Sequence, residues 1–151
     1  VPVASGLVDF VIALSVVGLM MVFYGVLPTI NLVFVPVLVV IMMLTAGAAG
    51  LWLSVLGVQY RDVRFAMQFF AQLLMYGAPV VWPASLISDK YHIIYGLYPM
   101  AGVIEGFRSA LLGKNPMPWD MIVAGTMSAA LLFMAGLFYF RRAERILADV
   151  A

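Results

Sequence analysis

Few side chains in this sequence could do chemistry, and they are widely spaced. The chain has no cysteine and a single histidine, His92, which excludes thiolate chemistry and a metal site built on several histidines. It contains no glycine-rich phosphate loop, no Ser-His-Asp set and no paired carboxylates at a catalytic spacing. We therefore expect no catalytic residue, no metal and no cofactor bound by this chain, and we interpret His92 as a residue of the membrane interface.

Aromatic side chains are the stronger candidates for binding. Their flat apolar faces suit the C–H groups of a sugar ring, and the polar tips of Tyr and Trp can bond its hydroxyls. The competing interpretation is an aromatic belt at the membrane–water interface, and composition alone does not choose between the two. The residues concerned are Tyr76, Trp82, Tyr91, Tyr95, Tyr98, Phe107 and Trp119.

Three charged residues stand out within apolar sequence. Glu105 and Arg108 are three residues apart, so they can pair on one helix face; a local salt bridge and the lining of a polar conduit are both open. Asp9 lies near the first end of an apolar stretch. An acid inside a membrane indicates function by default, but a structural pair with a neighbouring helix explains Asp9 equally well.

The composition sets the class of protein. Of the 151 residues, 66% are hydrophobic and only 10% are charged, whereas soluble domains carry about 25% charged residues. The mean hydropathy is +1.12. The sequence therefore predicts an all-α integral membrane protein, and its net charge of +1 offers no basic excess for nucleic acid.

Four segments are apolar enough to cross a membrane, which takes about 20 residues. We expect spans at about 3–24, 32–58, 65–80 and 120–140, of which the third is short. The sequence 93–112 is apolar too, but its glycines, Pro99, Glu105 and Arg108 argue against a fifth span. We expect an amphipathic helix there, at an interface or lining a wet cavity. Its apolar face holds Met100, Val103, Ile104, Phe107 and Leu111, and its other side holds Ala101, Glu105, Arg108 and Ser109.

The stretch "GAPVVWP", residues 77–83, interrupts the third segment. Pro79 and Pro83 end regular hydrogen bonding, and non-helical backbone at membrane depth survives only where protein or a wet cavity surrounds it. With four spans, Arg61, Arg64 and the arginines of the tail 141–151 share one side of the membrane. That side holds more cations next to span ends, so we expect it to be cytoplasmic, with the C-terminus. Residues 79–113 then form an external gate region.

Two further clusters have open interpretations. Small residues at helical spacing form one face of the second segment and indicate either a subunit interface or ordinary packing within the chain. The charged turn after this segment is either a headgroup anchor or a contact for a cytoplasmic partner. The small residues are Ala46, Gly50, Ser54 and Gly57, and the turn contains Tyr60, Arg61, Asp62 and Arg64.

Several dispersed motifs, in order, resemble one family. These are "YRDVR" at 60–64, "PVVWP" at 79–83, "YPMAGVIEGFRSALLG" at 98–113 and "RRAERILADVA" at 141–151. Together they resemble the permease subunit of ABC-2 type transporters, and most closely the group that exports O-antigen, capsule and teichoic acid polysaccharides. The resemblance covers nearly the whole chain and implies that it is the C-terminal part of a six-helix permease of the inner membrane.

The resemblance also implies partners and site residues. Such permeases form homodimers, each copy binds a separate ATPase subunit that uses ATP and Mg²⁺, and the substrate is a lipid-linked glycan. The turn 60–64 would face the ATPase. The residues implied at the channel or gate are Tyr76, Pro79, Trp82, Pro83, Tyr95, Tyr98, Glu105, Phe107 and Arg108. An ABC-2 exporter of a drug or a lipid is the second hypothesis, and a non-transport scaffold or lipid-modifying enzyme is the third.

Overall fold

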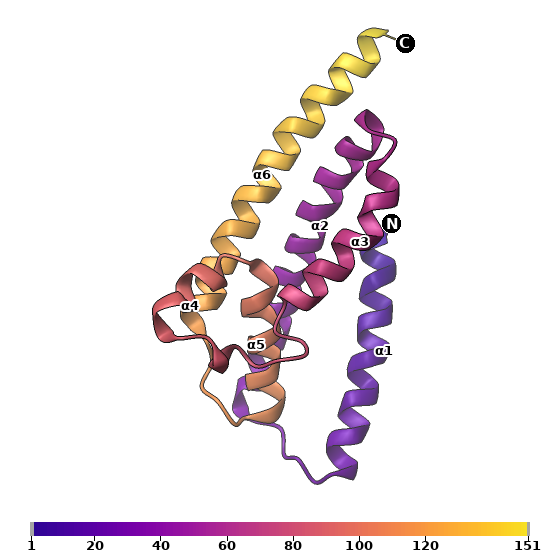
Figure 1. Ribbon diagram of the computed structural model, residues 1–151. Helices are drawn as coiled ribbons and strands as arrows, with labels where there is room; N and C mark the ends of the chain where they lie inside the picture. The colour runs from indigo at the N-terminus through magenta and orange to yellow at the C-terminus, as the bar shows by residue number, and fades with distance from the viewer. Residues whose placement is uncertain (1, 151) are drawn as a thin grey trace.

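The computed structural model describes residues 2–150, and all regular secondary structure within that range is helical (Figure 1). Long apolar runs without prolines in their interiors account for the longest helices, because all backbone groups then bond within the segment. In chain order the elements are α1 (Pro2–Phe23), the 3₁₀ helix η1 (Ile30–Phe34), α2 (Val35–Gln59), α3 (Val63–Gly77), the 3₁₀ helix η2 (Ala84–Leu86), α4 (Asp89–Gly96), α5 (Pro99–Leu112) and α6 (Trp119–Val150).

Three helical segments, rather than the four predicted, are long and apolar enough to cross a membrane. They are Val3–Phe23, Ile30–Gln59 and Trp119–Ile146. The predicted third span, 65–80, corresponds to α3, which has only 15 residues and ends at Gly77. A helix of that length rises about 22 Å, less than the roughly 30 Å of a hydrocarbon core. The break at Pro79 comes too early for a full crossing by helix alone.

Helices α2 and α6 form the central pair of the fold. Gly47 of α2 faces the Phe133 ring, and Gly136 of α6 faces Leu51 and Trp52, so a Cβ at either glycine would lie 3.2–3.3 Å from its neighbour. The Trp52 indole also donates a hydrogen bond to the Leu132 carbonyl at 3.0 Å. Small residues therefore let the two backbones approach, as expected for helices in lipid.

Helix α5 lies against both members of this pair. A Cβ at Gly102 would lie 2.7 Å from the Met121 carbonyl oxygen, and one at Gly106 would lie 2.7 Å from the Leu38 side chain. Val103 of α5 joins a buried cluster with Leu38, Ile41 and Ile122. Gly113 ends α5 with φ of 64°, a left-handed conformation that suits glycine.

The sequence 93–112 is not a single helix, because it is divided between α4 and α5. The polar side of α5 is buried as well as Val103 of its apolar side. The buried side contains the small and polar residues Ala101, Glu105 and Ser109. Most of the predicted apolar face, including Met100 and Ile104, is only half-buried. In lipid an apolar side chain loses little by facing outward, and small residues give the closest packing.

Residues 141–150 of the predicted tail continue α6, which runs without interruption to Val150. Its sequence there is rich in Ala, Leu, Arg and Glu, which are good helix formers; residue 151 lies outside the described residues. In Figure 1 the C-terminal end of α6 and the turn after α2 lie at the same end of the molecule. The arginines of both segments therefore share one end, as the sequence predicted.

Candidate functional site

The chain leaves α3 as a non-helical segment that is held tightly on α5. Ala78 is 3% exposed, and the next two residues turn through a Val80 N–H bond to the Ala78 carbonyl at 2.8 Å. Pro79 is among the most buried side chains of the protein. Backbone of this kind at membrane depth requires protein around it, and α5 provides that support.

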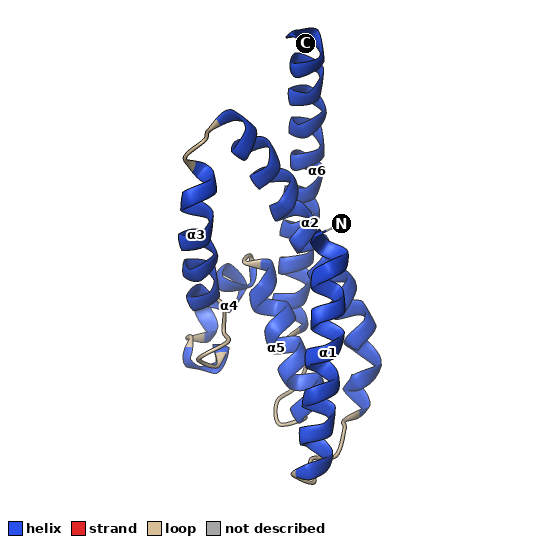
Figure 2. Cartoon of the chain, turned by 90° about the vertical axis from the view of Figure 1, so that its right-hand side faces the viewer, coloured by secondary structure: helices blue, strands red, loops and turns tan. Residues whose placement is uncertain are grey.

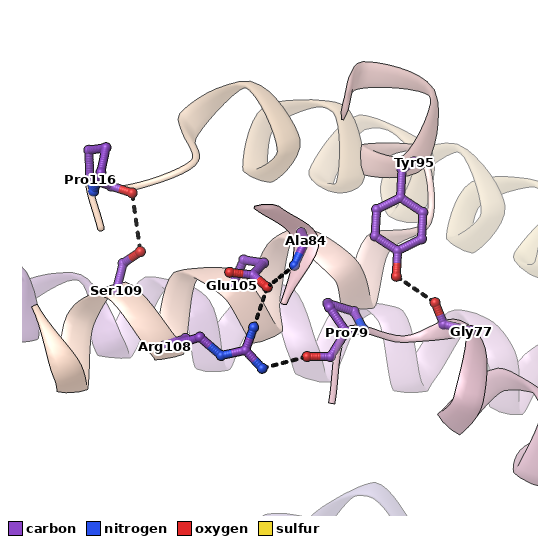
Figure 3. Close-up of polar contacts among 8 residues, drawn as sticks. All are labelled: Gly77, Pro79, Ala84, Tyr95, Glu105, Arg108, Ser109 and Pro116. Atoms are coloured by element: carbon purple, nitrogen blue, oxygen red, sulfur yellow. Dashed lines mark hydrogen bonds and ion pairs between the residues drawn. The ribbon is translucent and has the colours of Figure 1, made fainter. Parts of the chain in front are cut away.

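An ion pair on α5 fastens this segment at two points (Figure 3). Arg108 pairs with Glu105 and also donates to the Pro79 carbonyl at 2.7 Å. Glu105, only 7% exposed, accepts the Ala84 N–H at 2.8 Å. A buried carboxylate needs both a counterion and hydrogen bonds. The pair is therefore a salt bridge within α5 that also anchors both ends of the segment 79–84.

Three aromatic side chains, Trp82, Tyr95 and Tyr98, form what we call the aromatic collar around the end of α3. The Tyr95 hydroxyl donates to the Gly77 carbonyl at 2.5 Å, and the Tyr98 hydroxyl donates to the Leu74 carbonyl at 3.1 Å. The Trp82 indole donates to the Tyr76 carbonyl at 3.3 Å. The last carbonyls of a helix have no partner within it, so the collar supplies partners for the Tyr76 and Gly77 carbonyls. The Leu74 carbonyl already accepts the Ala78 N–H at 2.9 Å and gains a second donor from Tyr98.

The hydroxyls of the two collar tyrosines, Tyr95 and Tyr98, stay protonated at ordinary pH. Burial raises the pKa of Tyr98 above its usual value of 10.0. Burial raises the pKa of Tyr95 as well, with smaller contributions from the charges of Tyr98 and Glu105. Both hydroxyls therefore remain hydrogen-bond donors to α3. Their tips are engaged, which leaves the ring faces for any contact with a ligand, and the Trp82 and Tyr95 rings already pair at 5.5 Å.

Not every residue predicted at the gate joins this site. Phe107 packs on Phe10 of α1 at a ring distance of 5.3 Å. Trp119, which is an aromatic candidate but not a predicted gate residue, packs edge-on against Phe34 at 4.8 Å. Pro83 lies next to the site as the residue before η2. Tyr76, Pro79, Trp82, Tyr95, Tyr98, Glu105 and Arg108 are the predicted residues that the structure brings together.

The charged turn and the small-residue face lie elsewhere. Residues 60–64 are mostly exposed, and among the described residues Asp62 forms no ion pair with either neighbouring arginine. On α2, Ala46, Gly50 and Ser54 are exposed, and a Cβ at Gly50 would have no heavy atom within 4 Å; Gly57 is open in the same way. This face is therefore not used for close helix packing within the described chain.

Asp9 is deeper than the sequence suggested. It lines a groove of about 590 Å³ between α1 and α2, together with Met42, Ala46 and Gly50. These α2 residues lie near the middle of Val35–Gln59, so Asp9 is level with the middle of that helix rather than with its end. An acid at that depth is costly in lipid and is expected to face protein or water.

Sequence reasoning missed a polar stripe along α3. Arg64, Gln68, Gln72 and Tyr76 recur every four residues, so they share one helix face, and all four are exposed. Figure 2 shows α3 standing apart from α1, α2 and α6, and none of its residues is buried. The repeated four-residue spacing of glutamines in an apolar segment was the available signal. Polar groups in a membrane segment are expected to face a wet cavity or a partner.

The fold and site together define a multi-pass helical membrane protein with a broken helix held by an internal ion pair. The family description that matches residues 1–112 is "ABC-2 type transporter". The chain belongs to the ABC-2 type transporter family. It is also 25% identical over 146 residues to the "O-antigen export system permease protein RfbA" of Myxococcus xanthus, covering 94% of this chain. The chain spans 56% of the length of that relative.

Proposed function

We propose that this chain is part of the permease subunit of an ATP-driven exporter that moves a lipid-linked polysaccharide across the inner membrane. The observation that carries the proposal is the polar stripe Arg64, Gln68, Gln72 and Tyr76, which ends at the aromatic collar. Amides and ring faces in one line suit a long hydroxylated chain that slides without a single tight site. The similarity to an O-antigen export permease supports the same class of substrate.

The remaining parts of the proposed exporter come from other chains. ATP hydrolysis belongs to a separate ATPase subunit, for which the family membership is the support. The exposed turn Tyr60–Arg64 is the proposed contact for that subunit, since it lies at the end of the molecule where the arginines gather. A second permease copy would complete the channel by facing α3, none of whose residues is buried within this chain.

An exporter of a drug or a lipid is the alternative that one observation favours. Several grooves of the chain are almost wholly apolar, including one of about 410 Å³ between α2, α3, α5 and α6. Such a groove suits an acyl chain or a hydrophobic drug better than a glycan. The lipid part of a lipid-linked glycan fits it equally well, so the groove does not separate the two cargoes. A scaffold without transport would have no ATPase partner.

The test replaces the stripe in the whole permease subunit. Gln68→Leu together with Gln72→Leu should lower the amount of polysaccharide on the cell surface while the subunit still accumulates in the membrane and binds its ATPase. The matched control is Phe69→Leu with Phe70→Leu, two exposed α3 residues off the stripe. Wild-type export by the glutamine variant contradicts a glycan path along this face. If the glutamine variant changes the resistance of the cells to a drug and has no effect on surface glycan, the alternative cargo is favoured.

A further inference from the structure

A small polar pocket lies beside the ion pair, where α4, α5, the loop 113–118 and the start of α6 meet. Its volume is about 280 Å³. Unlike the apolar grooves of this protein, it is lined by polar side chains from each of these elements and from η2. They are Ser85, His92, Glu105, Ser109, Asn115 and Asp120.

Two of these side chains have unused hydrogen-bonding capacity. The Nε2 atom of His92 is buried and has no partner in the described part of the chain. Glu105 accepts both of its hydrogen bonds through Oε1. Figure 3 shows its second oxygen turned toward the side of Ser109, away from Arg108. Buried polar groups normally have partners, so the pocket is built for a molecule that supplies them.

The lining restricts the chemistry of that molecule. The carboxylate of Asp120, which forms no ion pair among the described residues, disfavours an anion, because like charges repel. Across residues 2–150, no three acidic or histidine side chains are close enough to hold one metal ion. The volume is at the lower limit for small-molecule pockets, which is too small for a drug-sized or lipid molecule. A compact, uncharged molecule with several hydroxyl donors satisfies these restrictions on charge and size.

We propose that this pocket binds a single sugar unit of the exported glycan. The inference rests on the proposed function, and it adds a site away from the polar stripe of α3. Neighbouring sugar hydroxyls would donate to the carboxylates and exchange hydrogen bonds with His92 and Asn115. Glu105 also accepts a hydrogen bond from the Ala84 N–H. A sugar bound to Glu105 would therefore act directly on the position of the segment 79–84.

Cysteine labelling tests occupancy without knowing which sugar binds. This chain has no cysteine, so Ser85→Cys places one thiol in the pocket of the whole subunit, with its ATPase present and any other cysteine replaced. The control, Ser88→Cys, lies in the same loop but outside the pocket lining, and both serines are exposed. Labelling by an impermeant thiol reagent is compared between cells that make the lipid-linked glycan and cells in which its synthesis is blocked.

We expect the glycan to slow labelling of Ser85→Cys severalfold and to leave Ser88→Cys unchanged. Adding Asp120→Asn, a change at an exposed residue, should weaken this protection, because the neutral amide of Asn accepts a weaker hydrogen bond than a carboxylate does, by about 1 kcal/mol or roughly fivefold in affinity. Asp89→Asn, an exposed acid outside the pocket, should retain it. Equal labelling rates with and without glycan, in cells that export it, overturn the pocket inference alone. A complex that exports no glycan contradicts the proposed function instead.

Discussion

At the scale of single residues, the ion pair of Glu105 and Arg108 has the largest predicted effect on stability. Arg108→Met would leave the carboxylate of Glu105, 7% exposed, buried without its cation. Removing one partner of a buried pair costs about 3–5 kcal/mol. We expect the lower end of that range, since the Arg108 side chain is 25% exposed. Thermal unfolding of the whole subunit in detergent measures the change.

The matched control for Arg108→Met is Lys114→Met. Lys114 is an exposed cation just beyond α5 and forms no ion pair among the described residues. A surface substitution of this kind changes the free energy of unfolding by less than about 0.5 kcal/mol. If the two variants unfold at the same temperature, the ion pair does not anchor the segment 79–84.

Glycine substitutions test how closely α5 packs. A Cβ at Gly102 would lie 2.7 Å from the Met121 carbonyl oxygen, a backbone atom that cannot move aside easily. We expect Gly102→Ala to destabilise the protein by about 1–3 kcal/mol, the usual cost of overpacking. Gly50→Ala has open space around its Cβ, and alanine favours a helix by about 1 kcal/mol over glycine. Chemical denaturation measures both variants. A lower free energy of unfolding for Gly102→Ala and a higher one for Gly50→Ala confirm the packing, and equal losses in the two variants contradict it.

At the scale of elements, the collar predicts that the end of α3 depends on two hydroxyls. Tyr95→Phe and Tyr98→Phe each remove one hydrogen bond to α3, worth about 1 kcal/mol. We expect faster amide hydrogen exchange around Ala78, with little change in α6. The matched control is Tyr91→Phe, because the Tyr91 hydroxyl makes no hydrogen bond within residues 2–150. Unchanged exchange in both collar variants would show that the carbonyls of α3 have other partners.

The collar also predicts a pH dependence. The pKa of Tyr95 and of Tyr98 is raised above 10.0 in the folded protein, so folding favours the protonated hydroxyls. Their stabilising contribution is complete below pH about 10 and is lost as the pH rises through the raised values. The difference in the free energy of unfolding between the wild type and the phenylalanine variants should therefore be constant below pH about 10 and shrink only above it.

The elements differ in how much of them could be predicted from sequence. Helices α1, α2 and the membrane part of α6 follow from long apolar runs, and the break after α3 follows from Pro79. The inward face of α5 could not be read from hydrophobicity, because in lipid the small residues around Gly102 pack inward while larger apolar residues face out. The contacts of Tyr95 and Tyr98 with α3 join elements far apart in sequence, and no local pattern encodes them.

At the scale of the whole molecule, the arrangement of charges predicts its orientation. The turn after α2 and the last part of α6 lie at one end of the molecule (Figure 1), and both carry arginines. Residues 78–118 lie toward the other end. An excess of Lys and Arg next to span ends marks the cytoplasmic side. The short α3 does not change this assignment, because α2 and α6 are each long and apolar enough to cross the membrane.

Single cysteines test the orientation directly, since this chain has none of its own. With any other cysteine of the whole subunit replaced, Ser88→Cys should react with an impermeant thiol reagent in intact cells. Ala148→Cys, an exposed position near the end of α6, should react only after the membrane is opened. Labelling of Ala148→Cys alone in intact cells would reverse the orientation. Labelling of both would mean that the α6 end and the gate region lie on the same side, which a full crossing by α6 does not allow.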